Sequence, residues 1–116
     1  MPHILVVDDD DLVRMMAMRV LSGNGYEVSG AIDGEDALSI LEEQAIDLIL
    51  SDIRMPRMDG KELHRQIKLR ACQIPFLAMS GEFSNPGDFD GFLEKPFRIE
   101  KLLFEVERLL LAQPVG

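Results

Sequence analysis

Four aspartates, Asp8 to Asp11, stand next to one another near the start of the chain, and Asp52, Ser80 and Lys95 each follow a short apolar run further along. Adjacent carboxylates repel one another unless a cation lies close by. Hard oxygen ligands suit Mg²⁺, which binds through few carboxylates together with waters and phosphate oxygens. Beside such an ion, one carboxylate acts as a nucleophile toward a phosphoryl group, whose charge an ammonium and a hydroxyl then bind. These residue types predict the formation of an aspartyl phosphate.

This chemistry requires that residues far apart in the sequence meet, and the alternation of elements predicts how. Apolar runs predict strands at residues 4–7, 26–31, 48–52, 75–79 and 91–94. Helical spacing predicts a helix after each of the first three strands and a last one marked by residues 102–110. The parallel sheet this implies has helices on both faces, and the carboxyl ends of its strands line one crevice. We expect Asp8, Asp9, Asp52, Ser80 and Lys95 to converge there.

The first helix is predicted from apolar positions that recur at helical spacing, which are Leu12, Val13, Met16, Ala17, Val20 and Leu21. Asp33 is a predicted N-cap for a helix that opens at Gly34. Asp10 and Asp11 are expected to cap the first helix and to complement its dipole, and Asp59 is expected to lie in a turn near a helix start. His3 and His64 are expected to have no catalytic or ligand role.

Residues 81–90 contain too many helix breakers for a full crossover helix. We expect a loop where a regular fold of this class would place its fourth helix. The loss of that helix leaves part of the sheet uncovered near the fourth and fifth strands. Phe83 and Phe89 are predicted to pack onto this uncovered part.

The composition limits the function classes. A chain of 116 residues is about one domain, and 21 acidic against 12 basic residues give a net charge of −9. This charge disfavours direct binding to nucleic acid or to anionic membranes. The single cysteine, Cys72, excludes an internal disulfide, and there is neither a signal-peptide pattern nor a membrane-spanning run. We expect a cytoplasmic protein.

Four motifs in this order resemble the receiver domain of bacterial two-component response regulators, over residues 3–112. They are the runs at residues 4–9, at 47–52 leading into 55–60, at 78–81 and at 95–97. The resemblance implies a flavodoxin-like, doubly wound fold, an α/β (βα)5 architecture with a five-stranded parallel sheet in the order 2-1-3-4-5 and the fourth helix replaced by a loop. It also implies a single receiver domain at residues 1–116, either free-standing or part of a larger signalling protein.

The resemblance also assigns roles to individual residues. It implies that Asp52 is the phosphoacceptor and that Asp8, Asp9, Asp52 and the main-chain carbonyl of Arg54 hold Mg²⁺. Ser80 matches the hydroxyl residue that moves to the phosphoryl group, and Phe92 matches the aromatic switch. Lys95 matches the lysine before a cis proline, here Pro96. Arg54 and Glu82 match the positions that tune the lifetime of the phosphoryl group, and their opposite charges are hypothesised to pair and to restrict water.

The implied function is that of a signalling module. It takes a phosphoryl group from a phosphohistidine of a histidine kinase or histidine phosphotransfer protein and changes a surface that binds a downstream protein. It catalyses only its own phosphorylation and dephosphorylation, and is otherwise not an enzyme. We expect a monomer or weak dimer, because the missing helix belongs to a face that many relatives use for dimerisation.

Two other functions stay open. A Mg²⁺-dependent phosphatase of the haloacid dehalogenase kind is suggested by Asp8-Asp9-Asp10 after an apolar strand, although Leu12 departs from that motif. A receiver-like scaffold that is never phosphorylated is the other alternative, and the five intact residues of the crevice argue against it. Phe92 also has a simpler interpretation as a core residue, since it lacks the hydroxyl that would favour a solvent-facing ring.

Overall fold

The computed structural model describes residues 1–55, 57–70, 73–81 and 89–112. Within these ranges, five parallel strands form one sheet in the order β2-β1-β3-β4-β5, which confirms the expected topology. The strands are β1 (His3–Val7), β2 (Glu27–Ala31), β3 (Leu48–Asp52), β4 (Phe76–Ser80) and β5 (Gly91–Glu94). The middle strands are almost wholly buried, because helices cover both faces of the sheet and the strands are apolar on both.

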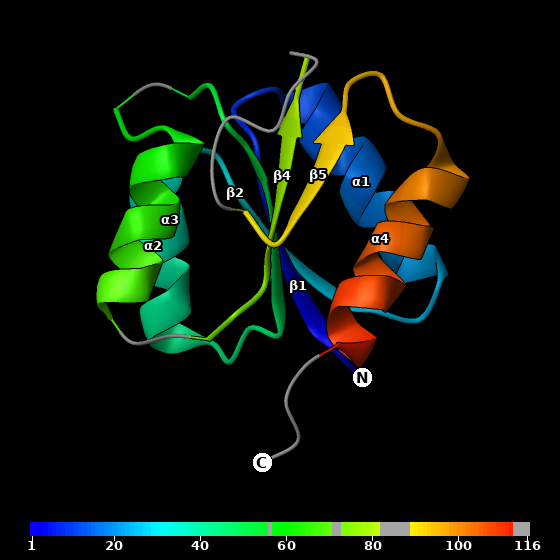
Figure 1. Ribbon diagram of the computed structural model, residues 1–116, viewed down its shortest axis with the longest axis horizontal. Coiled ribbons are helices and arrows are strands. Elements are labelled where there is room, and N and C mark those ends of the chain that lie inside the picture. The colour runs from blue at the N-terminus through cyan, green and yellow to red at the C-terminus, as the bar shows by residue number, and fades with distance from the viewer. Residues whose placement is uncertain (56, 71–72, 82–88, 113–116) are drawn as a thin grey trace.

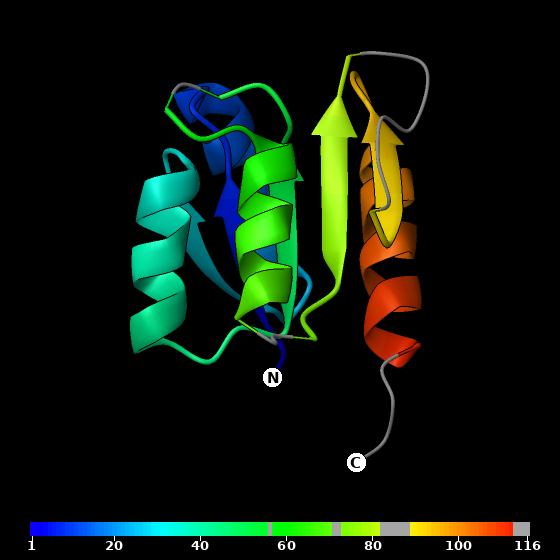
Figure 2. The ribbon, with the colours of Figure 1, turned by 60° about the vertical axis from the view of Figure 1, so that its left-hand side comes forward.

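Four helices pack on the sheet, and they are α1 (Asp11–Gly23), α2 (Gly34–Glu43), α3 (Gly60–Leu69) and α4 (Ile99–Leu111). α2 and α3 cover one face, and α1 and α4 cover the other (Figure 1). Figure 2 shows α2 and α3 side by side in front of the sheet. Side chains alternate along each strand, so each strand contributes to both cores. In β4, Phe76 and Ala78 join the core under α2 and α3, whereas Leu77 and Met79 join the core under α1 and α4.

Aspartates begin three of these helices. Asp10, Asp33 and Asp59 each accept a hydrogen bond from a main-chain N–H two or three residues later, which satisfies donors that the first helical turn leaves open. The expected capping role of Asp10 and Asp33 is confirmed. Asp11 instead lies in the first turn, where its carboxylate pairs with the Arg14 guanidinium.

The buried face of α1 is narrower than its sequence pattern predicts. Leu12 is 80% exposed and Met16 is 40% exposed, whereas Ala17 and Leu21 are fully buried. The apolar positions on this helix occupy two adjacent stripes, and only one of them faces the sheet. The helix predicted from this spacing is confirmed, but helical spacing marks apolar stripes without saying which one meets a neighbour.

The connection between β4 and β5 bears on the predicted missing helix. Residues 82–88, and with them Phe83 and Glu82, lie outside the described part of the chain, and no helix is assigned at the described positions 81, 89 and 90. Phe89 is 8% exposed, and its ring stacks on Phe76 at 5.3 Å between centroids. The prediction that Phe89 packs onto this part of the sheet is confirmed. His64 of α3 is buried against both rings, at 4.9 and 5.0 Å.

Candidate functional site

The candidate site lies at the carboxyl ends of the parallel strands, which point upward in Figure 1. Asp8 follows β1 directly, Asp52 ends β3, Ser80 ends β4 and Lys95 follows β5. The order of strands places β3 and β4 between β1 and β5. Because parallel strands share one polarity, their four polar ends meet at the same edge of the sheet.

Lys95 joins two of the carboxylates. Its Nζ donates a hydrogen bond to Asp8 Oδ2 at 3.0 Å and lies 3.4 Å from Asp52 Oδ1. Asp8 is fully buried and also accepts a hydrogen bond from the Asp10 main-chain N–H. The Ile53 N–H donates to Asp52 Oδ1 at 2.9 Å. Residues that are 87 positions apart in the sequence, Asp8 and Lys95, are therefore direct partners.

The electrostatics of the site perturb two groups. Burial raises the pKa of the Asp52 carboxyl above its ordinary value; the nearby Lys95 charge lowers it by less, and the Asp8 charge raises it further. Burial alone would lower the pKa of the Lys95 ammonium, but the hydrogen bond to Asp8 and the charge of Asp52 together raise it. Lys95 is thus held in its charged form beside the acidic groups.

The acidic groups fit a hard divalent cation. Oxygen atoms of Asp8, Asp9 and Asp52 lie within 4.8 Å of one another. Each pair of charges at that separation repels by about 3 kcal/mol at an effective dielectric constant of about 20. One ammonium cannot neutralise three carboxylates, and all the donors are oxygens, which Mg²⁺ prefers. The donor set and its charge therefore match the ion that the sequence suggests.

A pocket opens beside this cluster. It has a volume of about 390 Å³ and is lined by Asp52, Arg54, Ser80, Gly81 and Lys95. Arg54 comes from the loop between β3 and α3, and Ser80 from the end of β4, where it is 5% exposed. The pocket brings a carboxylate, a hydroxyl, an ammonium and a guanidinium to one cavity, a set of one nucleophile and three hydrogen-bond donors that suits a phosphoryl group.

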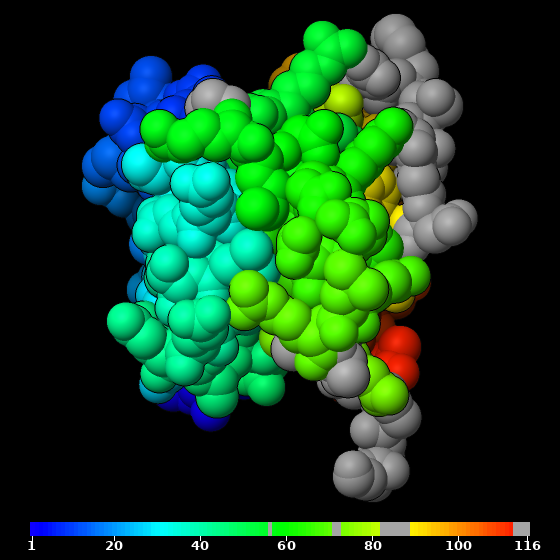
Figure 3. All heavy atoms as spheres, turned by 90° about the vertical axis from the view of Figure 1, so that its left-hand side faces the viewer, coloured from blue at the N-terminus to red at the C-terminus, as the bar shows by residue number. Residues whose placement is uncertain are grey.

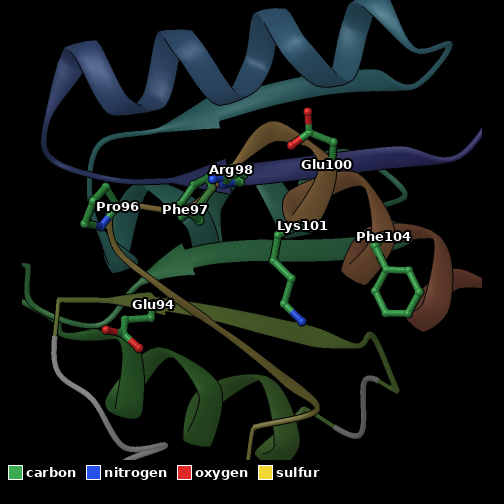
Figure 4. A pocket seen from close by; sticks show the side chains of 7 residues that line it. All are labelled: Glu94, Pro96, Phe97, Arg98, Glu100, Lys101 and Phe104. Carbon is green, nitrogen blue, oxygen red and sulfur yellow. The ribbon is translucent and has the colours of Figure 1, made fainter.

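A wider hollow lies between the segment after β5 and the start of α4 (Figure 4). It has a volume of about 780 Å³, and its lining includes Glu94, Pro96, Lys101 and Phe104. The peptide bond between Lys95 and Pro96 is cis. The charged groups that line this hollow are of both signs. The cluster of Asp8, Asp9 and Asp52, by contrast, gathers three carboxylates, so the cluster fits a cation and the hollow does not.

Ser80 and Phe92 lie toward the same core. Ala78 pairs with Phe92 across β4 and β5, and Ser80 pairs with Glu94. Since alternate residues of a strand share a face, Ser80 lies on the same face as Ala78, which belongs to the core under α2 and α3. Phe92 is half-buried against this same core. The hydroxyl and the ring are therefore neighbours along one face of the sheet.

Gly60 brings the start of α3 close to the end of β3, the strand that carries Asp52. Its N–H donates to the Ile53 carbonyl at 2.7 Å, and a Cβ at this position would lie 2.7 Å from the Asp52 carbonyl oxygen. Only glycine allows this approach. The sequence places Gly60 in a motif, but its contact with Asp52 was not evident there; an Asp-Gly pair at a helix start is the signal that could have indicated it.

An ion pair between the β3–α3 loop and the residue before α2 was also missed by sequence reasoning. The Arg57 guanidinium donates two hydrogen bonds to Asp33 Oδ2, from Nε at 3.0 Å and from Nη2 at 2.5 Å. The main-chain hydrogen bond from Asp36 and the contact with Arg57 hold the pKa of the Asp33 carboxyl below its ordinary value. No local pattern indicates a pair between residues 24 positions apart.

Comparisons with known proteins agree with this geometry. The family model of the response regulator receiver domain matches residues 4–107. The chain is 39% identical over 115 residues to the response regulator MprA of Mycolicibacterium vanbaalenii, a match that covers 93% of this chain and 50% of that protein. It is 38% identical over 119 residues to the sensor kinase CckA of Brucella abortus, covering 95% of this chain and 13% of that protein. The solved structure of the chemotaxis protein CheY4 of Vibrio cholerae matches with a TM-score of 0.88 at 34% identity, covering 94% of this chain and 98% of that one. The chain thus spans half the length of the first relative and a smaller part of the second.

Proposed function

We propose, because the chain belongs to the response regulator receiver domain family, that Asp52 accepts a phosphoryl group from a phosphohistidine with the help of Mg²⁺. Membership of this family makes the chain a two-component signalling module. The observation that carries the finer proposal is the contact of Lys95 with both Asp8 and Asp52 at the carboxyl edge of the sheet. In this geometry the Asp52 carboxylate is available as a nucleophile, and the Lys95 ammonium lies where it can offset the negative charge of the incoming phosphoryl group.

The Asp52 carboxylate is the nucleophile. Both the Ile53 N–H and the Lys95 Nζ contact its Oδ1, and we assign Oδ2 to the attack. An O–P bond forms from Oδ2 as the P–N bond of the phosphohistidine breaks. The imidazole nitrogen keeps the electron pair of that bond and takes up a proton, and the histidine leaves neutral.

The incoming phosphoryl group brings close to two negative charges into a site that already holds three carboxylates. Asp8, Asp9 and Asp52, with the main-chain carbonyl of Arg54, would hold Mg²⁺, which supplies charge neutralisation for the phosphoryl oxygens. Lys95 donates to a phosphoryl oxygen from one side of the pocket. The Ser80 hydroxyl donates from the end of β4, which forms another wall.

The output of this step is a change of a protein-binding surface. Movement of Ser80 toward the phosphoryl group frees space on the face of the sheet that it shares with Phe92, and the half-buried ring turns into that space. Arg54 lines the pocket and, with Glu82, is proposed to set the lifetime of the phosphoryl group by limiting the access of water.

Beyond the site, we propose that residues 1–116 form one receiver domain that acts in the cytoplasm as a monomer or weak dimer, with Pro96 as the cis proline that follows Lys95. Its partners are a histidine kinase or histidine phosphotransfer protein and a downstream protein target. Its net charge of −9 argues against direct contact with nucleic acid or an anionic membrane. No helix in the described ranges combines the length and apolarity needed to cross a membrane.

One experiment tests the proposed chemistry. The protein is incubated with Mg²⁺ and a small acyl phosphate, and the product is examined by mass spectrometry and by its stability to acid and base. We expect one adduct, stable to acid and labile to base, that Asp52→Asn abolishes. Asp47→Asn is the matched control, because Asp47 precedes β3 at its opposite end and is exposed.

Other outcomes would favour the alternatives. Steady hydrolysis of phosphomonoesters that depends on Asp8 would indicate the phosphatase. A protein that neither forms an adduct nor responds to Mg²⁺ with beryllofluoride, a mimic of the phosphoryl group, would indicate the scaffold.

A further inference from the structure

The described residues of the loop between β3 and α3, 53–55 and 57–59, are attached to their surroundings at two places. At its base, the Gly60 N–H donates to the Ile53 carbonyl. Further along, Arg57 and Met58 both reach the first residues of α2. Arg57 binds the Asp33 carboxylate, and the Met58 side chain packs so closely on Gly34 that a Cβ there would meet it at 2.8 Å. Figure 3 shows the green loop lying against the cyan start of α2.

The ion pair in this contact is asymmetric. The side chain of Arg57 is 59% exposed, whereas that of Asp33 is 4% exposed. A buried carboxylate keeps its charge only with partners, and Arg57 supplies two hydrogen bonds besides the one from the start of α2. The pair between Arg65 and Glu62 has an arginine of equal exposure, but its carboxylate is 39% exposed. Loss of Arg57 would therefore leave a buried charge without its partner, whereas loss of Arg65 would leave Glu62 in contact with water.

The backbone of Arg57 also depends on this contact. Arg57 has φ of 67°, and among the described residues it is the one non-glycine with a positive φ. A residue with a Cβ adopts this conformation only where its surroundings hold it. The two hydrogen bonds from Arg57 to Asp33 Oδ2 help to hold this conformation, together with the contacts of Gly60 and Met58.

We propose that Arg57 is a positioning residue for the phosphoacceptor site, acting by fixing the loop that carries Arg54 to the start of α2. This rests on the proposed function, because the segment being positioned is the wall of the pocket that Arg54 forms next to Asp52. Neither Arg57 nor Asp33 lines that pocket. Their effect is exerted on the path of the main chain between Ile53 and Gly60.

The test compares Arg57→Ala, Asp33→Asn and the double variant with the wild type, and uses Arg65→Ala as the matched control. Two quantities are measured on the full chain: the dissociation constant for Mg²⁺ by calorimetry, and the NMR order parameters of the Arg54 and Met55 amides without metal. We expect Arg57→Ala to raise the dissociation constant by roughly threefold to tenfold, less than the loss of a direct partner of a metal ligand. The order parameters should fall from about 0.85 toward roughly 0.6.

The variants separate positioning from general stability. Asparagine at position 33 can still cap α2, so Asp33→Asn provides a folded variant even if Arg57→Ala does not fold. The double variant should match the single variants, because each single variant removes the same ion pair. Arg65→Ala should change neither quantity. A lower melting temperature for Arg57→Ala with unchanged Mg²⁺ binding and unchanged order parameters would overturn the proposal.

The failure of the proposed function has a different signature. In that case the wild type itself would bind no Mg²⁺ and form no adduct with an acyl phosphate. The order parameters are measured without metal, so they still decide whether Arg57 fixes the loop.

Discussion

Replacement of Gly60 by alanine tests how closely α3 must approach β3, the strand that carries Asp52. The added Cβ would lie 2.7 Å from the Asp52 carbonyl oxygen and 2.8 Å from the Ile53 Cα. Both are main-chain atoms, one at the end of the central strand β3 and the other in the residue that follows it, so they cannot rotate aside as a side chain would. The start of α3 must therefore move outward by several tenths of an ångström, which stretches the hydrogen bond from the Gly60 N–H to the Ile53 carbonyl.

The size of the effect follows from this overlap. Overpacking costs about 1–3 kcal/mol, and the better helix propensity of alanine returns up to about 1 kcal/mol. We expect the free energy of unfolding of Gly60→Ala to fall by about 1–2 kcal/mol. A misplacement of about 1 Å lowers catalysis by about a hundredfold, so a smaller shift next to Asp52 should slow phosphorylation roughly tenfold.

Two assays measure these effects, urea unfolding for stability and the initial rate of adduct formation with an acyl phosphate. Gly23→Ala is the control, because Gly23 ends α1 and a Cβ there would meet nothing within 4 Å. Its stability should stay within about 0.5 kcal/mol of the wild type. If Gly60→Ala unfolds at the wild-type urea concentration and is phosphorylated at the wild-type rate, the steric reasoning is refuted.

Three further predictions concern the core, the pH dependence and the metal. Phe89→Ala should lower the free energy of unfolding by about 3 kcal/mol, since it removes a buried ring stacked on Phe76; a loss below about 1 kcal/mol in urea unfolding would contradict its packing role. The folded pKa of Asp33 is depressed, so the stability that its charge contributes is fully present above the unfolded value of about 3.9 and is lost as the pH falls through the folded pKa. Urea unfolding between pH 7 and pH 2 measures the free energy of unfolding of wild type and of Asp33→Asn, and the difference between the two should shrink only on the acid side. A difference that stays constant would argue against the ion pair. Lys95→Met should bind Mg²⁺ roughly tenfold more tightly in calorimetry, because it removes a cation that lies 3.0 Å from Asp8. Phosphorylation of this variant should be slower. Weaker Mg²⁺ binding would show that Lys95 organises the carboxylates instead of competing with the metal.

The residues of the site were predictable because each one ends a buried apolar run. The strand limits were accurate to one or two residues; β2 begins at Glu27 instead of Tyr26, and β4 begins after Pro75. Parallel strands have one direction, so a list of strand ends is also a list of neighbours at one edge of the sheet. Phe89 was predictable for a related reason, since helix breakers in the sequence before it predict that the sheet nearby is uncovered, and an aromatic ring there would pack on that apolar surface.

The contacts across the site were not predictable in the same way. The pairing of Arg57 with Asp33 depends on a backbone conformation that arginine rarely adopts, and no propensity signals it. The exposure of Leu12 depends on the rotation of α1 about its own axis, which the sheet sets and the apolar pattern leaves open. Helical spacing is a property of the helix alone, whereas the burial of a residue depends also on which side of the helix packs against its neighbour.

The amino-acid sequence by itself determined which groups this protein brings to its site, because the chemical identity of Asp8, Asp52, Ser80 and Lys95 and their places at strand ends are local properties. Only the tertiary structure decided how those groups are held. The contact of Lys95 with two carboxylates, the approach of Gly60 to Asp52 and the attachment of the loop by Arg57 all join segments that are distant in the sequence. Such contacts form when the packing of two layers of helices on one sheet fixes the distances between their ends, and no segment contains that information alone.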